Sequence, residues 1–122
     1  MQKILLLEDE KTMGKLYKKN LEEVGHEVRL VHTVASAKRL IKTFQPTLAF
    51  IDQGIKGQAL SGLDFVPILR KLLPQIKIVI FSNYSDFYSK EKAINAGADD
   101  YLVKLNNPPN VLIVYIKNLH LF

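Results

Sequence analysis

Residues 4–9 of the chain read ILLLED, an apolar run that ends in two carboxylates. An unbroken apolar run of this length is typical of a strand that is buried on both faces of a parallel sheet. Three later runs end in a similar way, with Asp52 after residues 47–51, Ser82 after 76–81 and Lys104 after 101–103. Because the carboxyl ends of parallel strands meet at one edge of a sheet, we expect these polar side chains to lie close together.

The segments between these runs carry the spacing of amphipathic helices. Apolar residues recur at three- and four-residue intervals from Glu10 to Val24, and Gly25 follows as a helix stop. Similar patterns predict further helices over 35–44 after a cap at Thr33 or Ser36, over 63–73 before Pro74, and from a cap at Asp86 to Ala96 before Gly97. The alternation of residues 26–31 predicts a further strand.

The last segment, residues 111–122, permits two interpretations. The prolines just before it favour a helix start. Val111 to Ile116 are apolar all round and rich in β-branched side chains, so by propensity they could equally form a sixth strand. With the helical interpretation, five strands alternate with five helices. This alternation predicts one α/β domain over residues 1–122 with a doubly wound parallel sheet.

The composition is that of an ordinary globular domain. The 122 residues are 48% hydrophobic and 24% charged, and they include no cysteine, which excludes disulfides and Cys-ligated metal. Neither a signal peptide nor an apolar stretch of the roughly 18 residues that span a membrane is found, so we expect a cytoplasmic protein without a membrane partner. The net charge of +5 comes from scattered lysines and arginines. It indicates solvated helix faces more than a nucleic-acid surface, and it is equally compatible with an acidic protein partner.

The polar residues at the expected sheet edge have the chemistry of a phosphoryl site. Glu8, Asp9 and Asp52 offer carboxylate oxygens, of which Mg²⁺ usually takes only one or two. Ser82 and Lys104 add a hydroxyl and an ammonium that can neutralise phosphoryl oxygens, and a carboxylate can act as the nucleophile. The sequence therefore predicts an acidic Mg²⁺ pocket. Without the metal, repulsion among the three carboxylates should raise the pKa of at least one of them.

In this arrangement the chain resembles the receiver domain of two-component response regulators over essentially its whole length. An acidic pair after the first strand, an Asp after the third, a hydroxyl after the fourth and a Lys after the fifth are each weak signals, but together they are specific. The spacing is also similar, with 30 residues from Asp52 to Ser82, 49 to Tyr101 and 52 to Lys104. The resemblance implies a flavodoxin-like fold with the strand order 2-1-3-4-5.

The resemblance also implies a phosphoacceptor and a metal site. Asp52 would be the phosphoacceptor and a Mg²⁺ ligand, and Asp9 would be a direct ligand. Glu8 would act on the metal directly or through water, and Gly54 would supply its backbone carbonyl. Lys104 would pair with the phosphoryl group.

Two further residues would form the switch. Ser82 would donate a hydrogen bond to the phosphoryl group, and Tyr101 would move inward into the space that Ser82 leaves. The protein would then be a signalling switch and not an enzyme, and helix 86–96, the fifth strand and the last helix would present the changed surface.

The implied partners are a histidine kinase or a histidine phosphotransfer protein on the input side, and an effector domain or a downstream protein on the output side. Residues 111–122 carry more apolar side chains than one helix face can bury. We therefore also expect that this helix can serve a partner or a homodimer.

Three departures from the family pattern motivate a second hypothesis. Leu105 stands where the family usually has Pro, Asn83 replaces a small residue, and the loop after Asp52 lacks the frequent Met-Pro and is longer than the common form. They suggest an interaction module that keeps the fold but is regulated without phosphorylation. A flavodoxin-like enzyme or flavin protein is disfavoured, because the acidic edge would repel a cofactor phosphate.

Taken singly, these residues have simpler explanations. Asp52 alone resembles a turn former before Gly54, Ser82 a cap, Lys104 a surface charge and Tyr101 a packing residue. The three histidines are widely spaced and form no metal-ligand motif, so we interpret His26, His32 and His120 as surface or packing residues.

Overall fold

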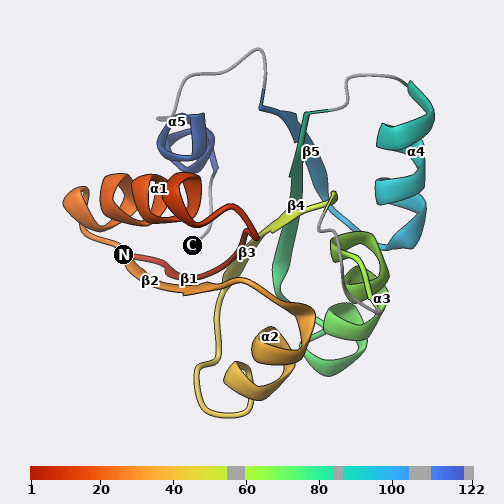
Figure 1. Cartoon of the computed structure of the whole chain (residues 1–122), viewed down its shortest axis with the longest axis horizontal. Coiled ribbons are helices and arrows are strands. Elements are labelled where there is room, and N and C mark those ends of the chain that lie inside the picture. The colour runs from red at the N-terminus through yellow and green to blue at the C-terminus, as the bar shows by residue number, and fades with distance from the viewer. Residues whose placement is uncertain (55–59, 84–86, 105–110, 120–122) are drawn as a thin grey trace.

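The computed structural model describes residues 1–54, 60–83, 87–104 and 111–119, and within them five parallel strands form a sheet between two layers of helices (Figure 1). The strands are β1 Lys3–Leu7, β2 Glu27–Val31, β3 Leu48–Asp52, β4 Lys77–Ser82 and β5 Asp100–Val103, in the order β2-β1-β3-β4-β5. The helices are α1 Lys11–Glu23, α2 Val34–Leu40, α3 Gly62–Leu72, α4 Phe87–Ala96 and α5 Val111–Lys117. The expected α/β class, helices and strand order are confirmed.

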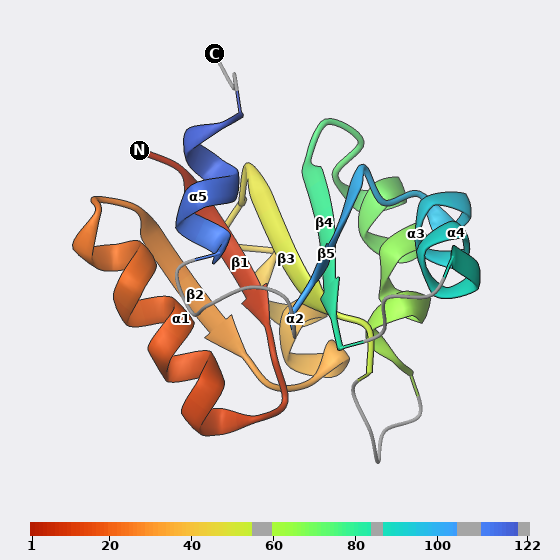
Figure 2. The same cartoon turned by 90° about the horizontal axis from the view of Figure 1, so that it is seen from above.

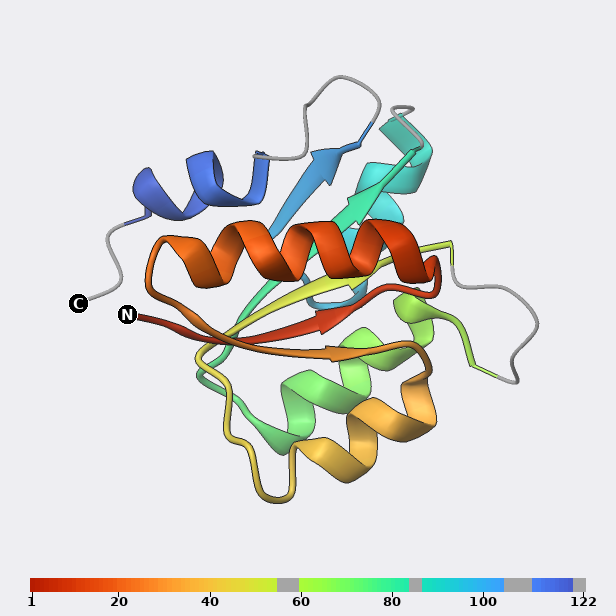
Figure 3. The same ribbon diagram turned by 60° about the vertical axis from the view of Figure 1, so that its left-hand side comes forward.

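The sheet is covered on both faces. Helices α2, α3 and α4 pack on one face, and α1 and α5 pack on the other (Figures 2 and 3). Successive side chains of a strand point to opposite faces, so β1 sends Leu5 and Leu7 to the first face and Ile4 and Leu6 to the second. All four side chains are fully buried. This two-sided burial explains why β1 is an unbroken apolar run.

Polar caps and glycines fix the ends of several helices. Glu10 caps α1, and its carboxylate accepts from the amides of Thr12 and Met13. Thr33, one of the two expected residues, caps α2 through the amide of Ser36. Gly25 and Gly97, which the sequence marks as helix stops, have positive φ angles of 97° and 119°.

Two segments differ from the simplest expectation. Residues 111–117 form the helix α5 and not a sixth strand, so the helical interpretation is confirmed there, while residues 120–122 lie outside the described residues. The helix α2 ends at Leu40, four residues before the expected end at Phe44. The amides of Thr43 and Phe44 still bond to the Leu40 carbonyl, but Pro46 disfavours the helical conformation at the residue before it.

No helix in the described part of the chain is long and apolar enough to cross a membrane. The expected cap at Asp86 and two of the three departures from the family pattern, at Leu105 and in the loop with residues 55–59, lie outside the described residues.

Candidate functional site

The strand register brings the expected site residues to one edge of the sheet. Leu7 pairs with Ile51, Asp52 with Phe81, and Ser82 with Val103. The residues that end or directly follow these strands therefore lie side by side, although they are far apart in sequence. They are Glu8, Asp9, Asp52, Ser82 and Lys104. The sequence-based prediction that they meet is confirmed, whereas their chemical roles remain predictions.

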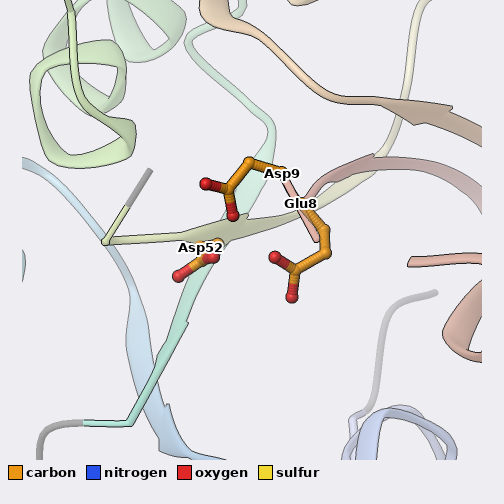
Figure 4. Close-up of side chains that lie close together, drawn as sticks. All are labelled: Glu8, Asp9 and Asp52. Atoms are coloured by element: carbon orange, nitrogen blue, oxygen red, sulfur yellow. The ribbon is translucent and has the colours of Figure 1, made fainter. Parts of the chain in front are cut away.

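Three carboxylates form the centre of the site. Glu8, Asp9 and Asp52 each offer one oxygen, and these oxygens all lie within 4.8 Å of one another (Figure 4). Glu8 is 1% exposed and Asp52 is 7% exposed, so two of the three carboxylates are almost removed from water. A compact set of hard oxygen donors is the chemistry that Mg²⁺ requires, and the residues present therefore fit this ion.

The Lys104 ammonium joins two of these carboxylates. Its Nζ lies 2.7 Å from Glu8 Oε1 and 3.3 Å from Asp52 Oδ2. It also lies 4.6 Å from the centre of the buried Phe81 ring, which is a cation–π contact. The Phe81 ring in turn meets Tyr17 of α1 edge-on at 5.4 Å. The Lys104 ammonium thus rests on an aromatic ring that is itself packed in the hydrophobic core.

Burial and mutual repulsion change the acidity of the cluster. Burial raises the pKa of Glu8 to about 7, and the neighbouring Asp52 adds to the rise while Lys104 opposes it. Burial also disfavours the charge on Lys104, but its hydrogen bond to Glu8 and the charge of Asp52 outweigh this and raise its pKa. Glu8 therefore takes up a proton more readily than a solvated carboxyl group does.

Backbone groups fix the orientation of the carboxylates. The amide of Gly54 donates to Asp52 Oδ1 at 3.0 Å, and the amide of Glu10 donates to Glu8 Oε2 at 3.2 Å. Gly54 thus lies beside Asp52, as expected for a residue of this site. The role of its carbonyl as a metal ligand stays a prediction.

One contact was missed by the sequence-based interpretation. The sequence predicts a surface or packing role for His32, whereas in the structure its Nδ1 lies 2.8 Å from the backbone carbonyl of Glu8. Because Leu7 pairs with Val31, the residues that follow these two strands are also neighbours. The strand register, had it been inferred, would have placed His32 next to Glu8.

The two expected switch residues lie on the same face of the sheet. Tyr101 pairs with Ile80, which is two positions before Ser82 on β4, and side chains two apart share a face. Ser82 is buried, whereas Tyr101 is half-buried and packs against the core beneath α2, α3 and α4. The two are therefore diagonal neighbours on adjacent strands.

The start of α3 lies very close to the backbone of Asp52. A methyl group added at Gly62 would lie 1.9 Å from the Asp52 carbonyl oxygen and 3.0 Å from Cγ2 of Ile51. No side chain fits in that space without moving one of the two segments. Glycine at this position thus sets the distance between α3 and the end of β3.

We compared the sequence with known protein families. The response regulator receiver domain matches residues 4–116 of the chain. The chain belongs to this family. The receiver domain is 31% identical over 117 residues to the alginate biosynthesis transcriptional regulatory protein AlgB of Pseudomonas putida, an alignment that covers 96% of this chain and 26% of AlgB. It is 27% identical over 111 residues to the nitrogen assimilation regulatory protein NtrX of Azorhizobium caulinodans, covering 91% of this chain and 24% of NtrX.

Solved structures show the same architecture. The receiver domain of NtrX from Brucella abortus superimposes with a TM-score of 0.84 at 29% identity, over 93% of this chain and 94% of that one. A CheY-like receiver domain protein from Methanospirillum hungatei JF-1 gives 0.85 at 26% identity, over 96% and 91%. This receiver domain spans about a quarter of the length of the two curated relatives.

Proposed function

We propose that this receiver domain is a phosphoacceptor switch in which Asp52 accepts a phosphoryl group in a Mg²⁺-dependent reaction. The proposal rests on the burial, the orientation and the charged neighbours of the Asp52 carboxylate. Its carboxylate is almost buried, it is oriented by the Gly54 amide, and it lies between two further carboxylates and the Lys104 ammonium. A carboxylate held in this way is aligned as a nucleophile without further rearrangement.

The transfer would proceed from a phosphohistidine of the partner. An oxygen of Asp52 forms a bond to phosphorus while the phosphorus–nitrogen bond breaks, and the bonding electron pair leaves with the imidazole. Lys104 already lies 3.3 Å from Asp52, so its ammonium can pair with an oxygen of the arriving phosphoryl group. Bound Mg²⁺ would supply neutralisation of the phosphoryl charge, and Glu8, Asp9, Asp52 and the Gly54 carbonyl would hold it.

The signal would leave the site through the α4, β5 and α5 surface. Ser82, which is buried at the end of β4, would donate its hydroxyl to the phosphoryl group. The position of Tyr101 on the same face supports its inward movement into the space beside Ser82. Each state is a packing arrangement of existing groups, so phosphorylation shifts a population between them.

We infer a histidine kinase or a histidine phosphotransfer protein as the input partner, and an effector domain or a downstream protein as the output. A homodimer through α5 receives little support from the described residues. Among the large apolar side chains of α5, Val114 is exposed at 48%, whereas Val111 and Leu112 are buried in the core.

The test is the intact mass of the chain after incubation with acetyl phosphate, with and without Mg²⁺. We expect a phosphoryl mass increment that requires the metal and is lost in Asp52→Asn. Asp64→Asn is the matched control, because Asp64 is an exposed carboxylate of the α3 capping box and lies outside the acidic cluster.

A folded wild-type chain that gains no phosphoryl group would overturn the proposal. It would favour the phosphorylation-independent interaction module, with Leu105 and Asn83 as the first residues to exchange.

A further inference from the structure

The amino-terminal edge of the sheet carries an apolar groove at the end opposite Asp52. One hollow of about 340 Å³ is lined chiefly by Pro46, Leu73, Pro74 and Ile76, where the chain enters β3 and β4. A second hollow of about 230 Å³ is lined by Ile41 and Leu72 among others. The two adjoin, because Gln45 and Leu73 line both. Together they form a groove between the end of α2 and the end of α3, which lie on the same face of the sheet (Figure 3).

The surroundings of this groove are basic. Residues 28–51 and 65–85 contain no Asp or Glu, but they contain seven Lys and Arg residues, Arg29, Lys38, Arg39, Lys42, Arg70, Lys71 and Lys77. Three of these pair with carboxylates, Arg29 with Glu27 of the same strand at 2.9 Å, Arg70 with Asp99 at 2.7 Å and Lys77 with Asp100 at the longer distance of 3.9 Å.

One of the remaining cations, Lys42, lines the groove. A second, Lys71, adjoins the lining residue Leu72 in the last turn of α3. Both are exposed, and neither forms an ion pair with another described residue. Two acidic residues at the start of β5 are already engaged, Asp99 by Arg70, and Asp100 by Tyr115 and, at 3.9 Å, by Lys77. The free charge at the rim is therefore positive.

The mouth of the groove also offers hydrogen-bonding groups. Gln45 and Gln75 are exposed, and their side-chain amides make no hydrogen bond to another described residue. Such amides can donate to and accept from an extended peptide backbone. An apolar recess with a few oriented polar groups is the common form of a specific binding site.

We propose that this groove binds an acidic segment of a partner protein, with a large apolar side chain in the recess and Asp or Glu beside Lys42 and Lys71. The recess argues against a membrane surface, because insertion into lipid needs several large protruding apolar side chains, and among the Leu and Ile side chains of the lining only Leu72 is largely exposed, at 54%. Nucleic acid is disfavoured because three of the cations already have carboxylate partners. The site lies at the opposite edge from Asp52, so docking and phosphorylation can occur together.

The test uses short random peptides displayed on phage and selected on the whole chain. Selected peptides are then synthesised, and their affinities are measured by fluorescence anisotropy. We expect sequences in which a Leu, Phe or similar residue is flanked by Asp and Glu. Lys42→Glu combined with Lys71→Glu should weaken their binding by about tenfold or more, because two attractive contacts become repulsive.

The matched control is Lys15→Glu combined with Lys19→Glu, which makes the same charge change on α1, on the other face of the sheet. This variant and Asp52→Asn should bind the peptides as the wild type does, so a failed phosphorylation test leaves the result interpretable. Leu72→Ser, at an exposed position that should not disturb folding, tests the apolar part of the groove separately.

Selected peptides without acidic enrichment, or with equal affinity for the Lys42 and Lys71 variant, would overturn the proposal. A second result would also overturn it. In that result no peptide binds, whereas phosphatidylserine vesicles or duplex DNA bind the wild type and bind the Lys42 and Lys71 variant more weakly. Such a result would assign the basic rim to a membrane or to nucleic acid.

Discussion

Two ion pairs of equal length lie at opposite edges of the sheet. Lys104 meets Glu8 at 2.7 Å at the carboxyl edge, with side chains that are 14% and 1% exposed. Arg70 meets Asp99 at 2.7 Å at the amino edge, with side chains that are 30% and 35% exposed. The distances alone do not distinguish the pairs, but their access to water does.

The difference in burial goes with different surroundings. At the carboxyl edge, the loss of water raises the pKa of Glu8 to about 7. At the amino edge, the Arg70 guanidinium also donates to the carbonyls of Gly97, Pro74 and Ile76, and Asp99 accepts from the amide of Ile78. The more solvated pair, with this network, connects the end of α3 to the starts of β4 and β5.

The largest effect is expected from Lys104→Met. The substitution removes the cation that faces Asp52, and we expect the initial rate of phosphorylation by acetyl phosphate to fall about 10²-fold or more. Lys77→Met is the control, since Lys77 lies at the amino edge and only approaches Asp100 at 3.9 Å. Rates are followed by intact mass. Equal rates in both variants would mean that the buried pair has no special function.

The next largest effect is expected from Arg70→Lys, and it concerns stability. A lysine keeps the charge but cannot reproduce the forked hydrogen bonds to Gly97 and Ile76, so we expect a loss of about 2 kcal/mol in the free energy of unfolding. Urea denaturation measures it, with Arg39→Lys as the exposed control on α2. The phosphorylation rate should not change. A slower rate with unchanged stability would reverse the roles assigned to the two pairs.

A smaller effect is expected from pH in the absence of Mg²⁺. The pKa of Glu8 is about 7 in the folded chain and near its ordinary 4.5 in the unfolded chain. Between these values the folded state binds more protons, so the free energy of unfolding should decrease as pH rises from about 5 to 7, by on the order of 1 kcal/mol.

Denaturation at several pH values checks this, and both Mg²⁺ and Glu8→Gln should flatten the curve. Added Mg²⁺ does so because it replaces the proton as the neutralising partner. A stability that rises over this pH range in the metal-free protein would show that Glu8 is already ionised.

The smallest effect is expected from Lys18→Ala. Lys18 and Glu22 are 2.8 Å apart, and their side chains are 36% and 44% exposed, which extends the comparison to a still more solvated pair. We expect a change of less than about 0.5 kcal/mol in the free energy of unfolding. A loss above about 1 kcal/mol, measured in the same urea series, would show that burial is not what separates the three pairs.

The fold was predictable because its central strands, β1, β3 and β4, are buried on both faces. Two-sided burial gives each central strand an unbroken apolar run, and the polar residue at the end of each run marks the same edge of the sheet. This is why the convergence of Glu8, Asp52 and Lys104 followed from the order of the runs alone. The last helix was harder to predict, since Val111 to Ile116 favour a strand by propensity and become helical through packing on β3 and β4.

Other parts of the site depend on neighbours that are distant in sequence. The contact of His32 with the Glu8 carbonyl requires the register of β1 and β2, and the position of Lys104 over Phe81 requires the side chains of two strands. The groove at the amino edge is built from two connections that no periodic pattern marks.

The contact between Gly62 and the Asp52 backbone has a consequence for how the chain tolerates insertions. Nine residues connect these two positions, and their ends lie so close that a Cβ at Gly62 would be 1.9 Å from the Asp52 carbonyl oxygen. Extra residues between Asp52 and Gly62 would lengthen a loop whose ends stay in place. Each doubling of such a loop costs only about 0.6 kcal/mol. The long connection in this chain is therefore compatible with an undisturbed Asp52, and the same segment is a suitable place to insert a reporter peptide.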